Sequence, residues 1–194
     1  MIKCQDVSFS YPASTLPDSE RPAGAALKHI SCTIEDGSFV LLCGTSGCGK
    51  TTMTRLFNGL IPHYHEGTYT GSVYLEGKDT RDLSLFDISL KVGSVFQNPR
   101  SQFFNVDTTS ELAFGPENHG IAEDLVRERV KRVAAQLKLE PLLDRSIFSL
   151  SGGEKQKIAC GSAAAIDPDI YVLDEPSSNL DAYAIADFRQ LLFT

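Results

Sequence analysis

Apolar and polar positions follow two periods along this chain, and the shorter period predicts strands. Residues 2–11 are typical of a strand that ends before a proline, with apolar side chains at Ile2, Cys4, Val7 and Phe9. The wholly apolar run at residues 39–43 predicts a strand buried on both faces, as in a parallel sheet. Further strands are expected at residues 27–34, 73–75, 92–96 and 170–173.

The longer period predicts helices. Among the charged residues of 124–139, apolar side chains recur at helical spacing, at Val126, Val130, Val133 and Leu137. Other helices are expected after a glycine-rich segment, ending near Asn58, and at residues 152–166 and 181–192, while residues 12–26 have the composition of a surface loop. Strands that alternate with helices predict an α/β fold with a largely parallel sheet, which binds its ligands at the carboxyl edge.

Composition and charge narrow the class of protein. The 194 residues suffice for one α/β core with a smaller appended region, and the net charge of −7 comes without any Lys/Arg-rich block. An extended nucleic-acid surface is therefore not expected. No apolar run is long enough to span a bilayer, and the first residues lack the apolar core of a signal peptide. Five cysteines without a Cys-x-x-Cys pair favour a reducing cytoplasm.

A glycine-rich segment carries the strongest chemical signal. It fits Gly-x-x-x-x-Gly-Lys-Ser/Thr and consists of Gly44, Thr45, Ser46, Gly47, Cys48, Gly49, Lys50 and Thr51, followed by Thr52. Glycines let backbone N–H groups surround a phosphate, and a helix N-terminus adds partial positive charge. Lys50 supplies a cation for the β- and γ-phosphates, and the Thr51 hydroxyl can coordinate Mg²⁺. The segment predicts a nucleoside-triphosphate site.

Two acids and a second glycine motif complete the chemistry. The apolar run 170–173 ends on Asp174, which can hold Mg²⁺ through its water shell, and Glu175, which can act as a general base on the attacking water. Acids at a strand end can also serve solubility alone. Upstream, Ser151, Gly152, Gly153 and Glu154 open a helix with a capping box. A second glycine-rich helix N-terminus is a second anion site, so it implies a γ-phosphate delivered by a partner subunit.

At this point the chain resembles the ATP-binding-cassette ATPases along its whole length. Residues 44–52 look like their Walker A loop, 150–156 like their signature motif and 170–175 like their Walker B strand. The resemblance implies a phosphate-loop NTPase core, an N-terminal antiparallel β subdomain and an inserted helical subdomain at about residues 98–150 of a single domain, 1–194. It also implies that Gln97 contacts Mg²⁺ and senses the membrane subunit, and that Tyr11 stacks on adenine. Asp181 is similar to the residue of the family's D-loop that bridges two subunits. Tyr11 could instead merely cap a strand.

A narrower resemblance concerns residues 97–104 and 111–118, which are similar to the ATPase subunits of energy-coupling-factor importers of vitamins or transition-metal ions. It implies Mg·ATP as the ligand and a second ATPase subunit as partner, identical or not. It further implies a transmembrane coupling subunit, a membrane substrate-binding subunit and a place at the cytoplasmic face of the membrane. These segments would form the groove that receives helices of the membrane protein. Plain core packing is the other interpretation of Phe103, Phe104 and Phe114.

The end of the chain departs from the family pattern. The family's switch histidine follows the D-loop by a helix and a strand, whereas the four histidines of this chain all precede the signature motif. The chain is therefore expected to be C-terminally incomplete, and its hydrolysis to be more affected than its nucleotide binding. Two alternatives remain open: a cassette ATPase outside transport, and a nucleotide-binding fragment without turnover. A GTPase is not expected, since no Asn-Lys-x-Asp motif occurs.

Overall fold

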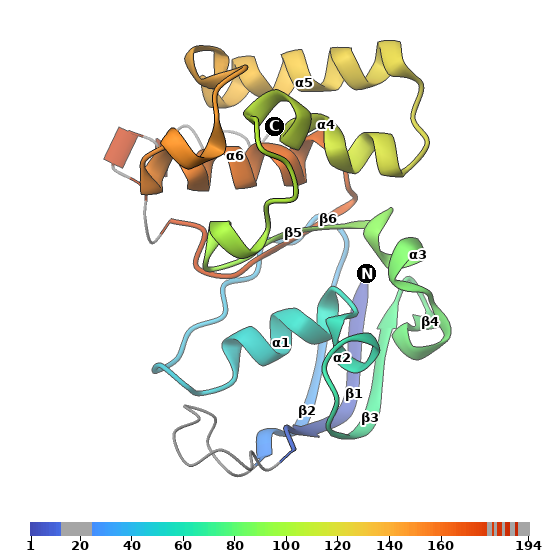
Figure 1. The fold of residues 1–194 in the computed structure, drawn as a ribbon. Helices are drawn as coiled ribbons and strands as arrows, with labels where there is room; N and C mark the ends of the chain where they lie inside the picture. The colour runs from blue at the N-terminus through green and yellow to red at the C-terminus, as the bar shows by residue number, and fades with distance from the viewer. Residues whose placement is uncertain (13–24, 178–179, 181, 184, 187–188, 190–194) are drawn as a thin grey trace. The chain divides into compact units, whose positions relative to one another are not determined.

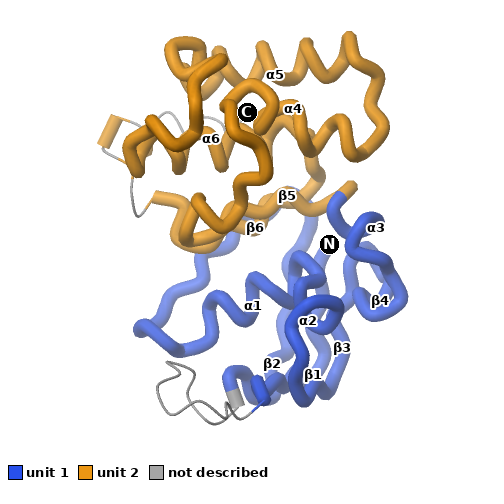
Figure 2. Tube along the Cα trace, in the orientation of Figure 1, with its two compact units in different colours: residues 1–89 blue, residues 90–194 orange. Residues whose placement is uncertain are grey.

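The computed structural model describes residues 1–12, 25–177, 180, 182–183, 185–186 and 189. The chain forms two compact units, Met1–Ser89 and Leu90–Thr194, which Figure 2 shows in different colours. Each unit is described by itself below. The predicted helix at 181–192 and most of the predicted loop at 12–26 lie largely outside the described residues.

Unit 1 is built on a four-stranded antiparallel sheet in the order β2-β1-β3-β4. Its strands are β1 (Ile2–Ser10), β2 (Ala25–Ile34), β3 (Thr68–Leu75) and β4 (Lys78–Asp79). The strands expected at residues 2–11, 27–34 and 73–75 are confirmed, and β3 begins earlier than predicted. The alternating side chains of β1 that the pattern marked as apolar are all buried, Ile2, Cys4, Val7 and Phe9. Antiparallel pairing with one covered face explains that alternation.

Helices of unit 1 follow the glycine-rich segment and the sheet hairpin (Figure 1). They are α1 (Lys50–Phe57), α2 (Leu60–His63) and α3 (Leu85–Ser89), with a 3₁₀ turn η1 (Thr80–Asp82). The predicted helix ending near Asn58 is confirmed as α1, which buries Met53, Leu56 and Phe57.

The predicted buried strand at residues 39–43 is wrong. These residues belong to neither sheet of the described chain, and Phe39 and Leu41 are 66% and 75% exposed. A strand buried on both faces needs hydrogen-bonded neighbours and two covering layers, and an apolar run cannot by itself provide them. The segment instead connects the end of β2 to the glycine-rich loop without forming a helix or a strand.

In the described part of unit 2, as far as residue 177, a small parallel sheet is joined to three helices. Strand β5 (Val92–Val95) pairs in parallel with β6 (Ile170–Leu173). The helices are α4 (Thr108–Asn118), α5 (Glu123–Leu137) and α6 (Gly152–Ala165), and the short 3₁₀ turns are η2 (Pro99–Ser101), η3 (Glu140–Leu142) and η4 (Ile147–Ser149). The predicted strands and the helices α5 and α6 are confirmed.

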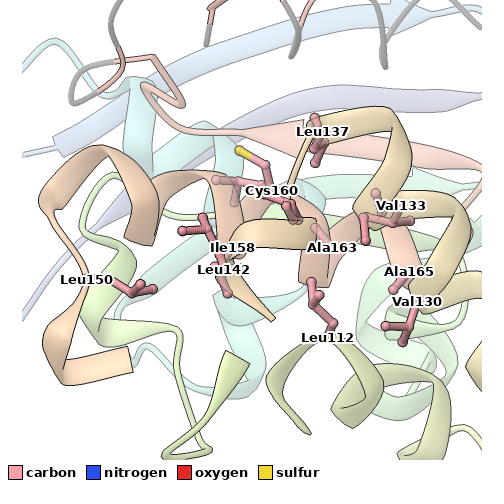
Figure 3. Packing of buried hydrophobic residues seen from close by; sticks show 14 of the residues in the cluster. Leu112, Val130, Val133, Leu137, Leu142, Leu150, Ile158, Cys160, Ala163 and Ala165 are labelled. Carbon is pink, nitrogen blue, oxygen red and sulfur yellow. The ribbon is translucent and has the colours of Figure 1, made fainter. Parts of the chain in front are cut away.

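The three helices of unit 2 share one apolar core. Figure 3 shows Leu112 of α4 and Val133 of α5 around Ile158 and Ala163 of α6. Gly161 of α6 makes the close packing possible, because a Cβ there would lie 2.8 Å from side-chain carbons of both Leu112 and Leu139. The core therefore fixes α6, the helix that begins with the second glycine motif.

Helix α4 is an element that the sequence pattern did not predict. It contains Gly115 and Pro116, which normally argue against a helix. Asp107 caps it by accepting a hydrogen bond from the backbone N–H of Ser110, 2.9 Å away, and Leu112 is fully buried. The mixed α/β fold class is confirmed. Among the described residues, no helix is long and apolar enough to cross a membrane.

Candidate nucleotide-binding site

Two glycines of the phosphate loop in unit 1 adopt a backbone conformation that other residues rarely take. Gly47 has φ +79° and Gly49 has φ +103°. A Cβ on Gly49 would also lie 2.6 Å from the carbonyl oxygen of Ala26 and 2.9 Å from a carbon of Leu27. Gly49 is thus required because its φ is positive and because there is no room for a Cβ. It directly precedes the first residue of α1.

Lys50 closes this loop on itself. Its Nζ donates to the carbonyl oxygens of Gly44 and Thr45, each 3.1 Å away. Helix α1 begins without a side-chain cap, since Gly49 has none to offer. Its first backbone N–H groups therefore remain available to an anion without competition from a cap, and the ammonium group lies on the same loop. Residues 44–48 are exposed, which leaves the loop accessible.

Tyr11 is held against α1 from the end of the first strand. Its hydroxyl oxygen accepts a 2.8 Å hydrogen bond from Arg55 and lies 3.5 Å from the Thr52 hydroxyl. The ring packs edge-on against Phe9 at 4.9 Å between centroids. The structure thus brings together two predicted nucleotide contacts, Tyr11 and Thr52. Arg55, which the sequence analysis did not single out, is the residue that ties them.

The two acids of unit 2 lie beside the predicted sensing glutamine. Because β5 and β6 are parallel and in register, their carboxyl ends coincide: Val95 is opposite Leu173, and the Asp174 N–H donates to the Val95 carbonyl at 2.9 Å. The Gln97 amide nitrogen donates to Glu175 Oε2 at 3.1 Å. The sequence alone could not show this contact, which spans 78 positions.

The environments of the two acids differ. Asp174 is buried, whereas Glu175 is exposed and has a left-handed backbone with φ +49°. A non-glycine residue in that conformation costs on the order of 1 kcal/mol, and such residues cluster at functional sites. The backbone turns at Glu175 directly after the strand, and this turn places its carboxylate beside Gln97.

The second glycine motif is a fully formed helix cap. Ser151 Oγ accepts from the Glu154 N–H at 3.3 Å, and Glu154 Oε2 accepts from the Ser151 N–H at 2.8 Å. That backbone N–H holds the pKa of Glu154 below its usual value. Behind the cap, the buried Lys155 donates to the Leu150 carbonyl at 2.7 Å. The predicted capping box is confirmed, and Gly152 stands in open space at its exposed tip.

The predicted magnesium ligands are the Thr51 hydroxyl, the Gln97 amide oxygen and the Asp174 carboxylate, which are hard oxygen donors of the kind that Mg²⁺ prefers. Because Gln97 donates to Glu175 with its nitrogen, its oxygen is the atom left to coordinate. Thr51 belongs to unit 1 and the other two to unit 2. The donor set fits the ion. Asp181, a predicted nucleotide contact, lies outside the described residues.

An aromatic pair lies on the surface of unit 2. Phe104 is 77% exposed and stacks on Phe114 with 4.8 Å between ring centroids and 16° between planes. The buried Glu111 fixes the backbone there, because its Oε2 accepts from the N–H groups of Phe104 and Asn105 at 3.0 and 2.8 Å. Core packing is therefore the wrong interpretation for Phe104, whereas Phe103 does pack against the core of unit 2.

Three features place this chain in the class of phosphate-loop nucleotide-binding domains. They are a phosphate loop that opens a helix, a pair of carboxylates at the end of a parallel strand, and a second glycine-rich helix cap. Comparisons with known proteins agree. The sequence profile of the family described as ABC transporter matches residues 27–178. An ABC transporter ATP-binding protein of Treponema denticola is 48% identical over 192 residues, and one of Pyrococcus horikoshii is 44% identical over 184 residues.

Solved structures show the same likeness. CbiO1 of Clostridium perfringens, described as part of the ABC transporter complex CbiONQ, matches 98% of this chain with 27% identity and a TM-score of 0.76, over 71% of its own length. The dimeric ATP-binding cassette MJ0796 bound to ADP and Pi matches 99% of this chain with 26% identity and a TM-score of 0.83, over 81% of its length.

The chain therefore belongs to the ABC transporter family, as an ATP-binding domain. It spans 38% of the length of the Treponema denticola relative and 61% of the Pyrococcus horikoshii relative, while the aligned regions cover 99% and 93% of this chain. The resemblance recognised in the sequence is confirmed at the level of the family.

Proposed function

We propose that this chain is the ATP-hydrolysing part of a membrane importer of the energy-coupling-factor type, acting at the cytoplasmic face of the membrane. Residues 98–150, which contain α4 and α5, would be its helical subdomain. Its partners would be a second ATPase subunit, a transmembrane coupling subunit and a membrane substrate-binding subunit. The transported solute would be a vitamin or a transition-metal ion. The likeness to CbiO1, described as part of the ABC transporter complex CbiONQ, supports this type.

The observation that carries the hydrolytic part of the proposal is the hydrogen bond between Gln97 and Glu175 at the strand end. It holds Glu175 by Oε2 and leaves Oε1 to accept a proton from a water that attacks the γ-phosphate. Lys50 would exchange its bonds to the Gly44 and Thr45 carbonyls for phosphate oxygens. Mg²⁺, held by the oxygens of Thr51, Gln97 and Asp174, would supply positive charge to the β- and γ-phosphates. Ser151, Gly152 and Gly153 would meet the γ-phosphate held by a partner subunit.

The test of hydrolysis compares the full-length protein with its Glu175→Gln variant at saturating Mg·ATP. Loss of the general base should lower the release of phosphate about a hundredfold or more, since such bases contribute about 10²–10⁴-fold. Glu128→Gln, on the exposed face of α5, is the matched control and should keep wild-type turnover. If both proteins bind ATP and release phosphate at the same rate, hydrolysis with Glu175 as the general base is refuted. The chain would then be a nucleotide-binding protein without this catalysis.

The importer part of the proposal rests on the surface aromatic pair of Phe104 and Phe114. A mostly exposed aromatic side chain on a backbone that a buried carboxylate holds in place is typical of a binding surface. Phe104→Ser should abolish co-purification with the transmembrane subunit and leave Mg·ATP binding unchanged. Leu125→Ser, which removes another exposed apolar side chain from unit 2, is the control. Retained co-purification by Phe104→Ser would refute this surface as the membrane-protein contact.

A further inference from the structure

One side chain of unit 2 connects the end of β5 to the middle of α6. Gln102 Oε1 accepts from the Phe96 N–H at 3.2 Å, and Gln102 Nε2 donates to the Ala159 carbonyl oxygen at 3.2 Å. Phe96 directly precedes Gln97, and Ala159 lies in the helix that starts at the capped glycine motif. Gln102 is half-buried at this junction.

The loop that carries Gln97 is closed from within. The Asn98 carbonyl accepts from the Ser101 N–H, and the Pro99 carbonyl accepts from the Gln102 N–H, each at 3.1 Å. The Asn98 side chain accepts from the Arg100 N–H at 3.1 Å. Together with the bond from Gln102 to Phe96, these contacts make residues 96–102 a single hydrogen-bonded ring. A displacement of Gln102 must therefore be felt at Gln97.

The chemistry of the junction selects an amide. One partner of Gln102 is a backbone donor and the other is a backbone acceptor, so the side chain must offer one oxygen and one N–H group. A carboxylate would keep the bond to Phe96 but would oppose its negative oxygen to the Ala159 carbonyl. The carbonyl oxygen of a helix has two lone pairs, so Ala159 can accept Gln102 without leaving the helical hydrogen-bond ladder.

We infer that Gln102 is a positioning residue that couples the signature helix α6 to the contact between Gln97 and Glu175. The inference rests on the proposed function. Ala159 lies eight residues after Ser151, which is about 12 Å along a helix. When the capped end of α6 meets the nucleotide of a partner subunit, Gln102 passes the displacement of the helix to the ring 96–102. The amide of Gln97 then aligns Glu175 for the attack.

The test is a double-mutant cycle in the full-length protein, with Gln102→Glu and Gln97→Ala alone and combined. Gln102→Glu should lower kcat about tenfold and leave KM for ATP unchanged, because the hydrogen bond to the Ala159 carbonyl is lost from the aligned state. In the Gln97→Ala background the same change should alter kcat less than twofold. Release of radiolabelled phosphate resolves the slow turnover of that background.

If Gln102 only stabilised the fold, the double-mutant cycle would give a different result. Gln102→Glu would then lower kcat by the same factor in both backgrounds, and this additivity would overturn the inference. Gln136→Glu, on the exposed side of α5, makes the same chemical change and should leave kcat at the wild-type value. If Gln102→Glu does not fold, Gln102→Met, which is uncharged and of similar length, enters the same cycle. If the wild-type protein shows no turnover beyond that of Glu175→Gln, the proposed function is refuted instead.

Discussion

The two glycine-rich segments of this chain use glycine for opposite reasons. In unit 1, the phosphate loop needs Gly49 for its own fold, since the backbone has φ +103° and the Ala26 carbonyl lies where a Cβ would stand. In unit 2, Gly152 has open space around it and begins an ordinary helix behind a complete capping box. The first glycine serves the conformation of the chain. The second leaves room for an incoming group.

The segments also differ in what stabilises them. Lys50 of the loop is bound by two carbonyl oxygens of that same loop, on an exposed surface. The signature motif is backed by the buried Lys155 and by the core of unit 2 around Ile158. A phosphate can therefore replace the two carbonyl oxygens as the partner of the Lys50 ammonium group. The helix cap of the signature motif, in contrast, is fully formed without a ligand. Changes that affect one segment should therefore leave the other intact.

The largest expected contrast concerns the thiols of the two segments. Cys48 is exposed in the loop, whereas burial raises the pKa of the Cys160 thiol in α6 to about 12. Near pH 8 a pKa three units above the ordinary value lowers the thiolate fraction about a thousandfold. Iodoacetamide should therefore modify the exposed Cys48 much faster than the buried Cys160, measured by peptide mass spectrometry. Mg·ATP should protect Cys48, and equal labelling with and without ATP would contradict its place beside the phosphates.

The burial of Cys160 also determines whether the free energy of unfolding rises or falls with pH. The unfolded chain ionises Cys160 near pH 9, whereas the folded chain keeps the proton up to about pH 12. The free energy of unfolding should therefore fall as pH rises from 9 toward 12, and Cys160→Ala should reduce that slope. Cys43→Ala, at an exposed position, is the control.

The next contrast is the loss of the loop's cation. Lys50→Met should weaken Mg·ATP binding about a hundredfold, because a hydrogen bond to a charged group contributes about 1.5–3 kcal/mol. Thermal stability should hardly change, since the ammonium group is exposed and bonded only to backbone. Isothermal titration calorimetry measures the affinity, with Lys131→Met on the exposed side of α5 as control. Unchanged affinity in Lys50→Met would remove this loop as the triphosphate site.

Helices α5 and α6 and most strands could be predicted because their pattern records their environment. In α5, Val126, Val130 and Val133 repeat at helical spacing because one face packs on the core. The cap of α6 involves only Ser151 and Glu154, which are three residues apart, so the sequence alone predicts it. The nucleotide motifs are equally local, which is why the family could be recognised.

Features that depend on distant partners could not be predicted. The apolar residues 39–43 looked like a buried strand, but burial depends on neighbours that the segment itself does not encode. Helix α4 forms despite Pro116 because Leu112 is buried against α6 and Asp107 supplies a cap. The bonds of Gln102 to Phe96 and Ala159 and of Gln97 to Glu175 are side-chain contacts set by tertiary packing. No spacing rule announces them.

A pair of alanine substitutions separates backbone conformation from space within the loop. Gly47→Ala meets only the positive φ, since nothing lies within 4 Å, and should cost about 1 kcal/mol of unfolding free energy. Gly49→Ala meets a positive φ of +103° and also the Ala26 carbonyl, and should cost about 2–3 kcal/mol. Urea unfolding measures both. Equal costs would mean that the loop can move away from Ala26.

Gly152→Ala should give the smallest effect on stability, with the opposite sign. Its backbone is helical and nothing lies within 4 Å of the added Cβ, so alanine should raise the free energy of unfolding by about 0.5 kcal/mol through its higher helix propensity. Turnover should nevertheless fall, because the methyl group occupies the space that the partner's γ-phosphate would enter. Urea unfolding and phosphate release are measured on the same preparation, with Gly120→Ala at an open position with φ +70° as control. A variant that is both more stable and fully active would show that this glycine serves neither the chain nor an incoming phosphate.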